Sequence, residues 1–154
     1  MNLHLNEVSW DLFYLDMARK ASERSKDPST KVGSVIIDSK KRFVSLGFNG
    51  FPRKMKDDGR LYDREAKYKR MIHAEENAIL FAKGDLEGYT IYVYPFMPCA
   101  HCASLISQCE MARVVSFKNN IIRWAENMET ARETFTECGI ELVEYSNEEL
   151  EKIL

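Results

Sequence analysis

The sequence predicts an α/β fold in which helices cover both faces of one sheet. Strand-like and helix-like patterns alternate after residue 70, which is typical of parallel strands joined by helical crossovers. Before that point, two runs rich in valine and isoleucine flank a short polar turn, which indicates a β-hairpin. The 154 residues suit a single domain, residues 1–154, that can bury a core without disulfides.

The first elements are a helix and the hairpin. Residues 8–26 carry apolar side chains at a helical spacing, with a charged opposite side. The hairpin runs, 31–38 and 42–48, are almost continuously apolar, so we expect strands that are covered on both faces. The polar segment 53–70 has no clear period, and we expect an irregular surface stretch there.

The later elements are predicted from periodicity and from the glycines that end two of the helices. Helices are expected at 73–83, 99–112, 123–138 and 147–154. Strands are expected at 89–95, 114–117 and 140–145.

Composition and charge exclude several classes of protein. A net charge of −2 argues against a general binder of nucleic acids or membrane surfaces. No apolar run approaches the ~20 residues that span a bilayer, and the N-terminus lacks the pattern of a signal peptide. The four cysteines are too scattered for a disulfide scaffold. We therefore expect a cytoplasmic protein with reduced thiols and without a nucleic-acid or membrane partner.

Two short stretches place soft metal ligands beside predicted helix starts. His73 and Glu75 lie in MIHAEENAIL, and Cys99 and Cys102 lie in YPFMPCAHCASLI. Thiols three positions apart share one helical face, and a helix N-terminus favours the thiolate form that binds metals. One imidazole and two thiolates are one ligand short of a closed tetrahedral site, which leaves a position open for chemistry.

H-x-E followed by P-C-x-x-C is the signature of the zinc nucleobase deaminases. Two thiolates weaken the field of Zn²⁺, so a water bound there needs a base close by. Glu75 is the candidate, as a proton shuttle between the zinc-bound water, the ring nitrogen and the departing ammonia.

The cysteine motif allows two other interpretations. A strand followed by C-x-x-C and a helix is also typical of thiol–disulfide oxidoreductases. No proline follows the motif here, however, and that interpretation leaves His73 and Glu75 without a role. A non-enzymatic zinc module would need a fourth protein ligand. His101 is the nearby candidate, but it falls on a different helical face, where we expect it to be exposed.

The chain resembles the deoxycytidylate (dCMP) deaminases of the zinc-dependent cytidine/deoxycytidylate deaminase family, from about Trp10 to Tyr145. The resemblance is carried by ARKASERSKDPSTKVGSVIID (18–38), GFNGFPRK (47–54), DREAKYKRMIHAEENAIL (63–80) and MPCAHCASLISQ (97–108). The zinc motif alone fits cytidine, guanine, riboflavin-pathway and tRNA-adenosine deaminases equally well. The first two stretches favour dCMP.

The resemblance implies a three-layer cytidine-deaminase-like fold with a five-stranded mixed sheet. It implies hydrolysis of dCMP to dUMP and ammonia, which supplies dUMP for thymidylate synthesis. The alternative substrates are a 5-modified dCMP or another nucleobase or nucleoside. Zinc would lie on His73, Cys99 and Cys102, Asn49 would hold the sugar hydroxyl, and the backbone of Ala74 would contact the pyrimidine carbonyl.

A nucleotide substrate needs cationic or N–H partners for its phosphate. Residues 51–70 hold eight basic and four acidic residues, between Asn49 and His73 in the sequence. Most of these side chains are expected to be solvated. The residues predicted to bind the phosphate are Ser29, Thr30, Lys31 and Arg53.

The resemblance also implies regulation and assembly. Related enzymes respond to dCTP and dTTP, with Mg²⁺ accompanying the nucleotide effector. The predicted effector site comprises Gly47, Phe48, Asn49 and Gly50, where the family often has a tyrosine in place of Phe48. A homo-oligomer, a hexamer or a dimer, is expected.

Overall fold

The computed structural model describes residues 9–154, so the helix start predicted at Val8 lies outside the described part. Five strands form one sheet in the order β2-β1-β3-β4-β5. The strands are β1 (Gly33–Ile37), β2 (Phe43–Phe48), β3 (Thr90–Tyr94), β4 (Arg113–Phe117) and β5 (Glu141–Tyr145). β1 runs antiparallel to β2 and β3, whereas β3, β4 and β5 are parallel. The predicted hairpin, the parallel crossovers and the mixed five-stranded sheet are confirmed.

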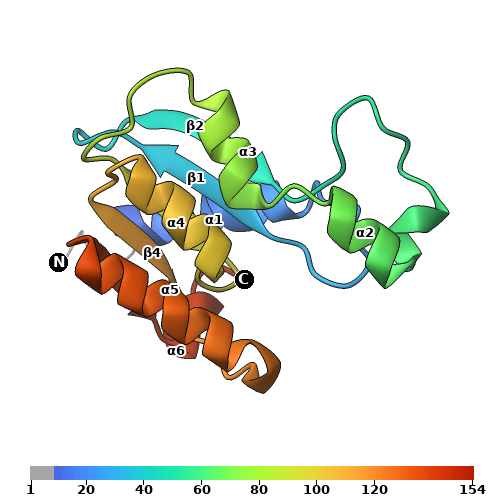
Figure 1. Ribbon diagram of the computed structural model, residues 1–154. Coiled ribbons are helices and arrows are strands. Elements are labelled where there is room, and N and C mark those ends of the chain that lie inside the picture. The colour runs from blue at the N-terminus through green and yellow to red at the C-terminus, as the bar shows by residue number, and fades with distance from the viewer. Residues whose placement is uncertain (1–8) are drawn as a thin grey trace, which may run out of the picture.

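Helices cover both faces of the sheet, as Figure 1 shows. α1 (Trp10–Ser22) packs on one face, where Leu150 of α6 (Asn147–Glu151) joins the same hydrophobic cluster. α3 (Ala74–Phe81), α4 (Ala100–Gln108) and α5 (Ala125–Glu137) contribute to a second cluster on the other face. Within residues 9–154, no helix has the length and apolar character needed to span a membrane.

The prediction that both hairpin strands are covered on both faces is wrong for β2. All five residues of β1 are buried, whereas burial alternates along β2 and leaves Phe43 and Leu46 exposed. β2 lies at the edge of the sheet, so part of its surface falls outside the helical layers. Its apolar sequence did not reveal that position.

Segment 53–70 is more regular than predicted. It contains a 3₁₀ helix, η1 (Gly59–Tyr62), and a short helix, α2 (Arg64–Arg70). Each begins with an aspartate cap: Asp58 accepts from the Arg60 N–H, and Asp63 accepts from the N–H groups of the first turn of α2. α2 buries no side chain fully, so no apolar period marks it in the sequence.

Two glycines allow helices to approach the sheet closely. A Cβ atom on Gly33 would lie 1.9 Å from the carbonyl oxygen of Ala18 in α1. A Cβ atom on Gly47 would lie 2.3 Å from the carbonyl oxygen of Ala74 and 2.5 Å from the nitrogen of Ala78, both in α3. Backbone atoms cannot rotate away, so these positions accept no larger residue without a shift of the helix.

Hydrogen bonds fix the start of α3 against the same strands. The Ser34 hydroxyl in β1 donates to the Ala74 carbonyl at 2.8 Å, and Ser34 is buried. The Asn77 side chain donates to the Phe48 carbonyl at 2.8 Å. The position of the first turn of α3 is therefore set by β1 and β2.

Asp11 joins α1 to three strands. Its carboxylate accepts two hydrogen bonds from Arg113, at 2.7 Å each, and further ones from the hydroxyls of Tyr92 and Tyr145. Burial alone would raise the pKa of Asp11, but the hydrogen bonds from Arg113 and the two tyrosines outweigh it and lower the pKa to about 2.

Gly47→Ala is expected to lower the free energy of unfolding by about 1–3 kcal/mol, because the new methyl group overlaps the backbone of α3. Gly59→Ala is the matched control, since nothing lies within 4 Å of a Cβ there. Urea denaturation at a fixed zinc concentration measures both. Equal stability of the two variants would contradict the close packing of α3 on β2.

Asp11→Asn is expected to cost about 2 kcal/mol of stability near neutral pH. The pKa of Asp11 is lower in the folded state, so its contribution is present above the unfolded value of about 3.9 and is lost as the pH falls toward 2. The difference from wild type should therefore roughly halve between about pH 6 and about pH 3 in urea titrations. Asp16→Asn, the same change at a half-exposed position of the same helix, is the matched control.

Candidate functional site

His73, Cys99 and Cys102 meet at one point. Each offers one ligand atom, and the three atoms lie within 4.8 Å of one another. The Nδ1 atom of His73 lies 3.5 Å from the Sγ atom of Cys99 and 3.3 Å from the Sγ atom of Cys102. Cys102 is buried, whereas His73 and Cys99 are partly exposed, so the cluster opens on one side.

The spacing of these atoms fits a tetrahedral zinc ion. Zn–S bonds of about 2.3 Å and Zn–N bonds of about 2.0–2.1 Å place sulfur and nitrogen about 3.5 Å apart across a tetrahedral angle. The two sulfur–nitrogen distances are 3.5 Å and 3.3 Å. Two thiols and an imidazole are also ligands that zinc prefers. Three protein ligands leave the fourth position for a water or a substrate.

Two helix starts create this geometry. His73 is the N-cap of α3 and Cys99 is the N-cap of α4, each with extended backbone dihedral angles. The Sγ atom of Cys99 accepts from the Cys102 N–H at 3.5 Å, as expected for an N-cap side chain and the third residue of its helix. The prediction that these side chains lie at helix starts is confirmed.

The charges of the three ligands depend on one another. A hydrogen bond with Cys102 and another with His73 lower the pKa of the Cys99 thiol to about 4. A hydrogen bond with Cys99, assisted by the negative charge of Glu75, raises the pKa of His73 to about 9. The hydrogen bond with Cys99 and burial raise the pKa of Cys102. The cluster therefore favours one thiolate by itself, and a dication would favour the second.

Two carboxylates follow His73 in the first turn of α3. Glu75 is buried, and burial raises its pKa to about 7, where a carboxyl group can both take up and release a proton. Glu76 accepts from the His73 N–H at 3.0 Å and so fixes the helix start. It also lies 3.8 Å from the ring of His101, which is exposed as predicted.

Asn127 supports the cysteine side of the cluster, a role that no motif or spacing in the sequence indicates. From α5, its side chain accepts a hydrogen bond from the Ala100 N–H at 2.8 Å. Ala100 lies between the two cysteines, so α5 fixes the orientation of the peptide that follows Cys99.

The predicted substrate residues Ser29, Thr30 and Asn49 lie together. The Asn49 amide accepts from the Val32 N–H at 2.9 Å and donates to the Thr30 carbonyl at 2.9 Å. Asn49 is buried, and both ends of its amide are engaged within the protein. Its role toward a sugar hydroxyl stays a prediction. The contacts seen are with the segment that precedes β1.

The remaining predicted substrate residues differ in position. Lys31 is exposed, and Ala74 is fully buried with its carbonyl bonded to Ser34. Arg53 lies over the ring of Phe81 at 5.7 Å, at the end of α3 that is remote from His73. The structure therefore does not bring Arg53 to the metal ligands.

The predicted effector residues line a hollow of about 690 Å³. Gly47, Phe48, Asn49 and Gly50 are among its lining residues, and so are Phe81 and the Arg53 side chain that lies over the Phe81 ring. The other cationic side chains in the lining are Arg24 and Lys26.

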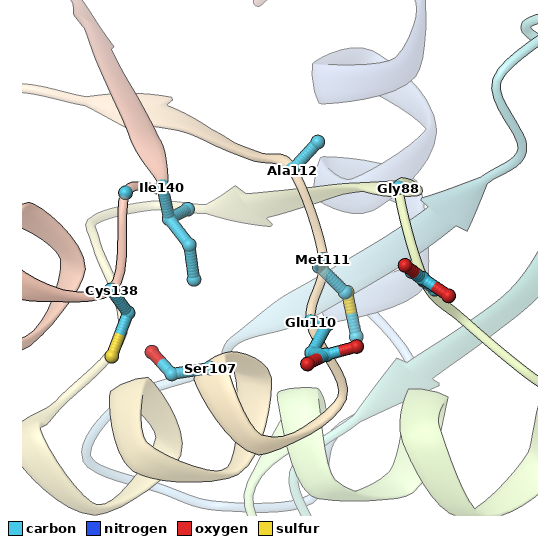
Figure 2. A pocket seen from close by; sticks show the side chains of 9 residues that line it. Gly88, Ser107, Glu110, Met111, Ala112, Cys138 and Ile140 are labelled. Carbon is cyan, nitrogen blue, oxygen red and sulfur yellow. The ribbon is translucent and has the colours of Figure 1, made fainter.

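A second cavity, of about 550 Å³, lies away from the metal ligands. Figure 2 shows Ser107 and Cys138 on one side of it and Met111, Ala112 and Ile140 nearby. The last two residues directly precede β4 and β5, whereas the ligand cysteines follow the opposite end of the sheet, after β3. This cavity therefore does not contribute to the cluster.

Sequence comparisons identify relatives of the chain. The family model described as the cytidine and deoxycytidylate deaminase zinc-binding region matches residues 8–118. An uncharacterized deaminase from the luxG 3′ region of Aliivibrio fischeri is 42% identical over 136 residues, which cover 86% of this chain and 91% of that protein. The deoxycytidylate deaminase of Homo sapiens is 33% identical over 140 residues, covering 86% of this chain and 78% of that protein.

Solved structures share the fold. The dCMP deaminase of cyanophage S-TIM5, in complex with dCMP and dUMP, superposes with a TM-score of 0.68 at 20% identity. The match covers 94% of this chain and 98% of that one. The RibD protein of Acinetobacter baumannii matches with a TM-score of 0.65 at 22% identity, over 89% of this chain and 35% of that one.

Zinc binding is expected to depend on Cys102 and not on Cys109, the C-cap residue of α4, which lies two turns after Cys102. Cys102→Ser should lose the one zinc ion per chain during dialysis, whereas Cys109→Ser should retain it. Metal analysis measures this, and the absorption of the cobalt-substituted protein reports the thiolate ligands. Full retention of zinc by Cys102→Ser would contradict the assigned ligand set.

Proposed function

Because the chain belongs to the cytidine and deoxycytidylate deaminase family, we propose that it hydrolyses dCMP to dUMP and ammonia. The observation that carries the proposal is the buried Glu75 beside the open His73–Cys99–Cys102 cluster. A base next to an open metal position is the arrangement that hydrolytic deamination needs. The relatives named deoxycytidylate deaminases support the choice of substrate.

His73, Cys99 and Cys102 would hold zinc, which when bound would supply the Lewis acidity that activates a water for attack on C4 of the pyrimidine. Glu75 accepts a proton from that water and delivers it to the ring nitrogen N3. Glu75 then takes the proton of the new hydroxyl group at C4 and gives it to the exocyclic amino group; the C4–N bond breaks, ammonia leaves and the C4 carbonyl forms. A carboxyl group whose pKa burial raises toward neutrality is suited to both transfers.

The segment before β1 is proposed to bind the phosphate. Ser29 and Lys31 are exposed and Thr30 is partly exposed, so their hydroxyls and ammonium group can reach a ligand. Through Asn49 this segment adjoins Gly50, which pairs with Ile72, the residue before His73. A nucleotide whose base reaches the metal ligands would therefore have its phosphate near this segment.

The hollow beside Gly47–Gly50 is the proposed place for a nucleotide effector. Its volume of about 690 Å³ suits a nucleotide, and Arg24 and Arg53 offer cations for phosphates. Lys26, also in the lining, is paired with Asp57 at 3.1 Å. Mg²⁺ would accompany a triphosphate there. Homo-oligomerisation stays a prediction.

Zinc-loaded protein is expected to release ammonia from dCMP and to be much less active on deoxycytidine at the same concentration. Glu75→Gln should lower kcat by about 10²–10⁴-fold while it retains zinc, because the proton shuttle is lost. Glu129→Gln, an exposed residue of α5, is the control and should be fully active.

Each outcome has a separate meaning. Turnover of neither substrate by protein with one zinc per chain would reject dCMP deamination and leave the metal site intact. Equal turnover of both substrates would show that the phosphate is not recognised. Full activity of Glu75→Gln would exclude it as the proton shuttle.

A further inference from the structure

Lys67 differs from the solvated basic side chains around it. Its side chain is 16% exposed, whereas that of Lys69, two residues later in α2, is 68% exposed. The Lys67 ammonium donates to Oδ1 of Asp27 at 3.0 Å and to Oγ of Ser29 at 3.1 Å. The Asp27 side chain is 7% exposed. α2 is therefore joined to the segment before β1 by a nearly buried ion pair.

Asp27 organises that segment. Its Oδ1 atom accepts from the Ser29 N–H at 2.8 Å and from the Thr30 N–H at 3.3 Å. Its Oδ2 atom accepts from the Asn49 side chain at 3.4 Å. Asn49 in turn binds the backbone of Thr30 and Val32. The backbone from 29 to 32 is thus held by two side chains that are both buried.

The Lys67 ammonium group is the cationic partner of the nearly buried Asp27 carboxylate. A carboxylate that loses its partner in a nearly buried position is strongly destabilised, and the surrounding chain rearranges to rehydrate it. The first groups affected would be the Ser29 and Thr30 N–H groups and the Ser29 hydroxyl, which share the same carboxylate and ammonium group.

We propose that Lys67 is a positioning residue for recognition of the substrate phosphate, acting through Asp27 on residues 29–31. This inference rests on the proposed function, since it concerns how that substrate is bound. The Lys67 ammonium group already donates to Asp27 and Ser29, so its proposed role is indirect, through the segment that these residues organise. α2 thereby sets substrate specificity from outside the metal cluster.

Lys67→Met is expected to raise the KM for dCMP about tenfold with kcat within about twofold, as for the loss of one charged hydrogen bond. Its kcat/KM for deoxycytidine should be unchanged, because that substrate carries no phosphate. Lys69→Met is the matched control, with the same change on the same helix, and should leave both substrates unaffected. A parallel loss for dCMP and deoxycytidine would overturn the inference and show a structural role only.

Asp27→Asn separates positioning from direct contact. If Lys67 positions residues 29–31, Asp27→Asn raises the KM for dCMP as well. The KM of the double variant is then no higher than that of the more impaired single variant. If Lys67 binds the phosphate directly, Asp27→Asn leaves or lowers the KM and the two effects add, which would overturn the inference. Lys67→Arg keeps the cation and should lie closer to wild type than Lys67→Met does.

Hydrogen exchange gives a readout that does not depend on turnover. The amide hydrogens of Ser29, Thr30 and Val32 should exchange faster in Lys67→Met and in Asp27→Asn than in the wild-type protein. Their exchange rates should be unchanged in Lys69→Met. Exchange rates equal to those of wild type in both Lys67→Met and Asp27→Asn would overturn the inference. If these amides exchange faster in the variants but the wild-type protein does not turn over dCMP, the proposed function alone is rejected. If Lys67→Met does not fold, Asp27→Asn provides the same readouts.

Discussion

Two helices, α3 and α4, begin at the same point of the molecule, and each begins with a cluster residue as its N-cap. The N-terminus of a helix carries a partial positive charge and free N–H groups. Two such ends facing one another repel unless anionic groups lie between them. The Cys99 thiolate and the carboxylates of the first turn of α3 meet that requirement. The same arrangement would hold a dication, with the thiolates turned toward it and the helix ends behind them.

The strands and neighbouring helices maintain this meeting point with short side chains. Gly47 and Ser34 bring α3 onto β1 and β2, and Asn127 fixes the start of α4 from α5. Ala78 and Ala103, both fully buried, leave little room between the helices and the sheet. Each of these contacts acts over a short distance, so the geometry of the cluster depends on the correct placement of β1, β2 and α5.

What could be predicted from the sequence was what depends on local spacing. The order of helices and strands follows from periodicity, and the ligands at helix starts follow from the i,i+3 cysteine pair and the capping positions. The edge position of β2 could not be predicted, because the burial of its side chains depends on neighbours distant in sequence. The helix at 64–70 was missed for another reason: its Asp63 cap is local, but the helix buries no side chain fully and so has no apolar period. Similarly, charge alone could not separate the partly buried Lys67 from the exposed Lys69, or place Arg53 on Phe81.

Asp11 has a consequence for the order in which the chain can acquire its structure. Its partners lie 81, 102 and 134 residues away, the last of them in β5. Contacts of such separation close large loops and form late, after the local helices and the hairpin. During synthesis, α1 can pack on β1 while the Asp11 carboxylate still faces water, and only the arrival of Tyr145 completes its set of donors. The strand at the far edge of the sheet thus completes a polar cluster begun by the first helix.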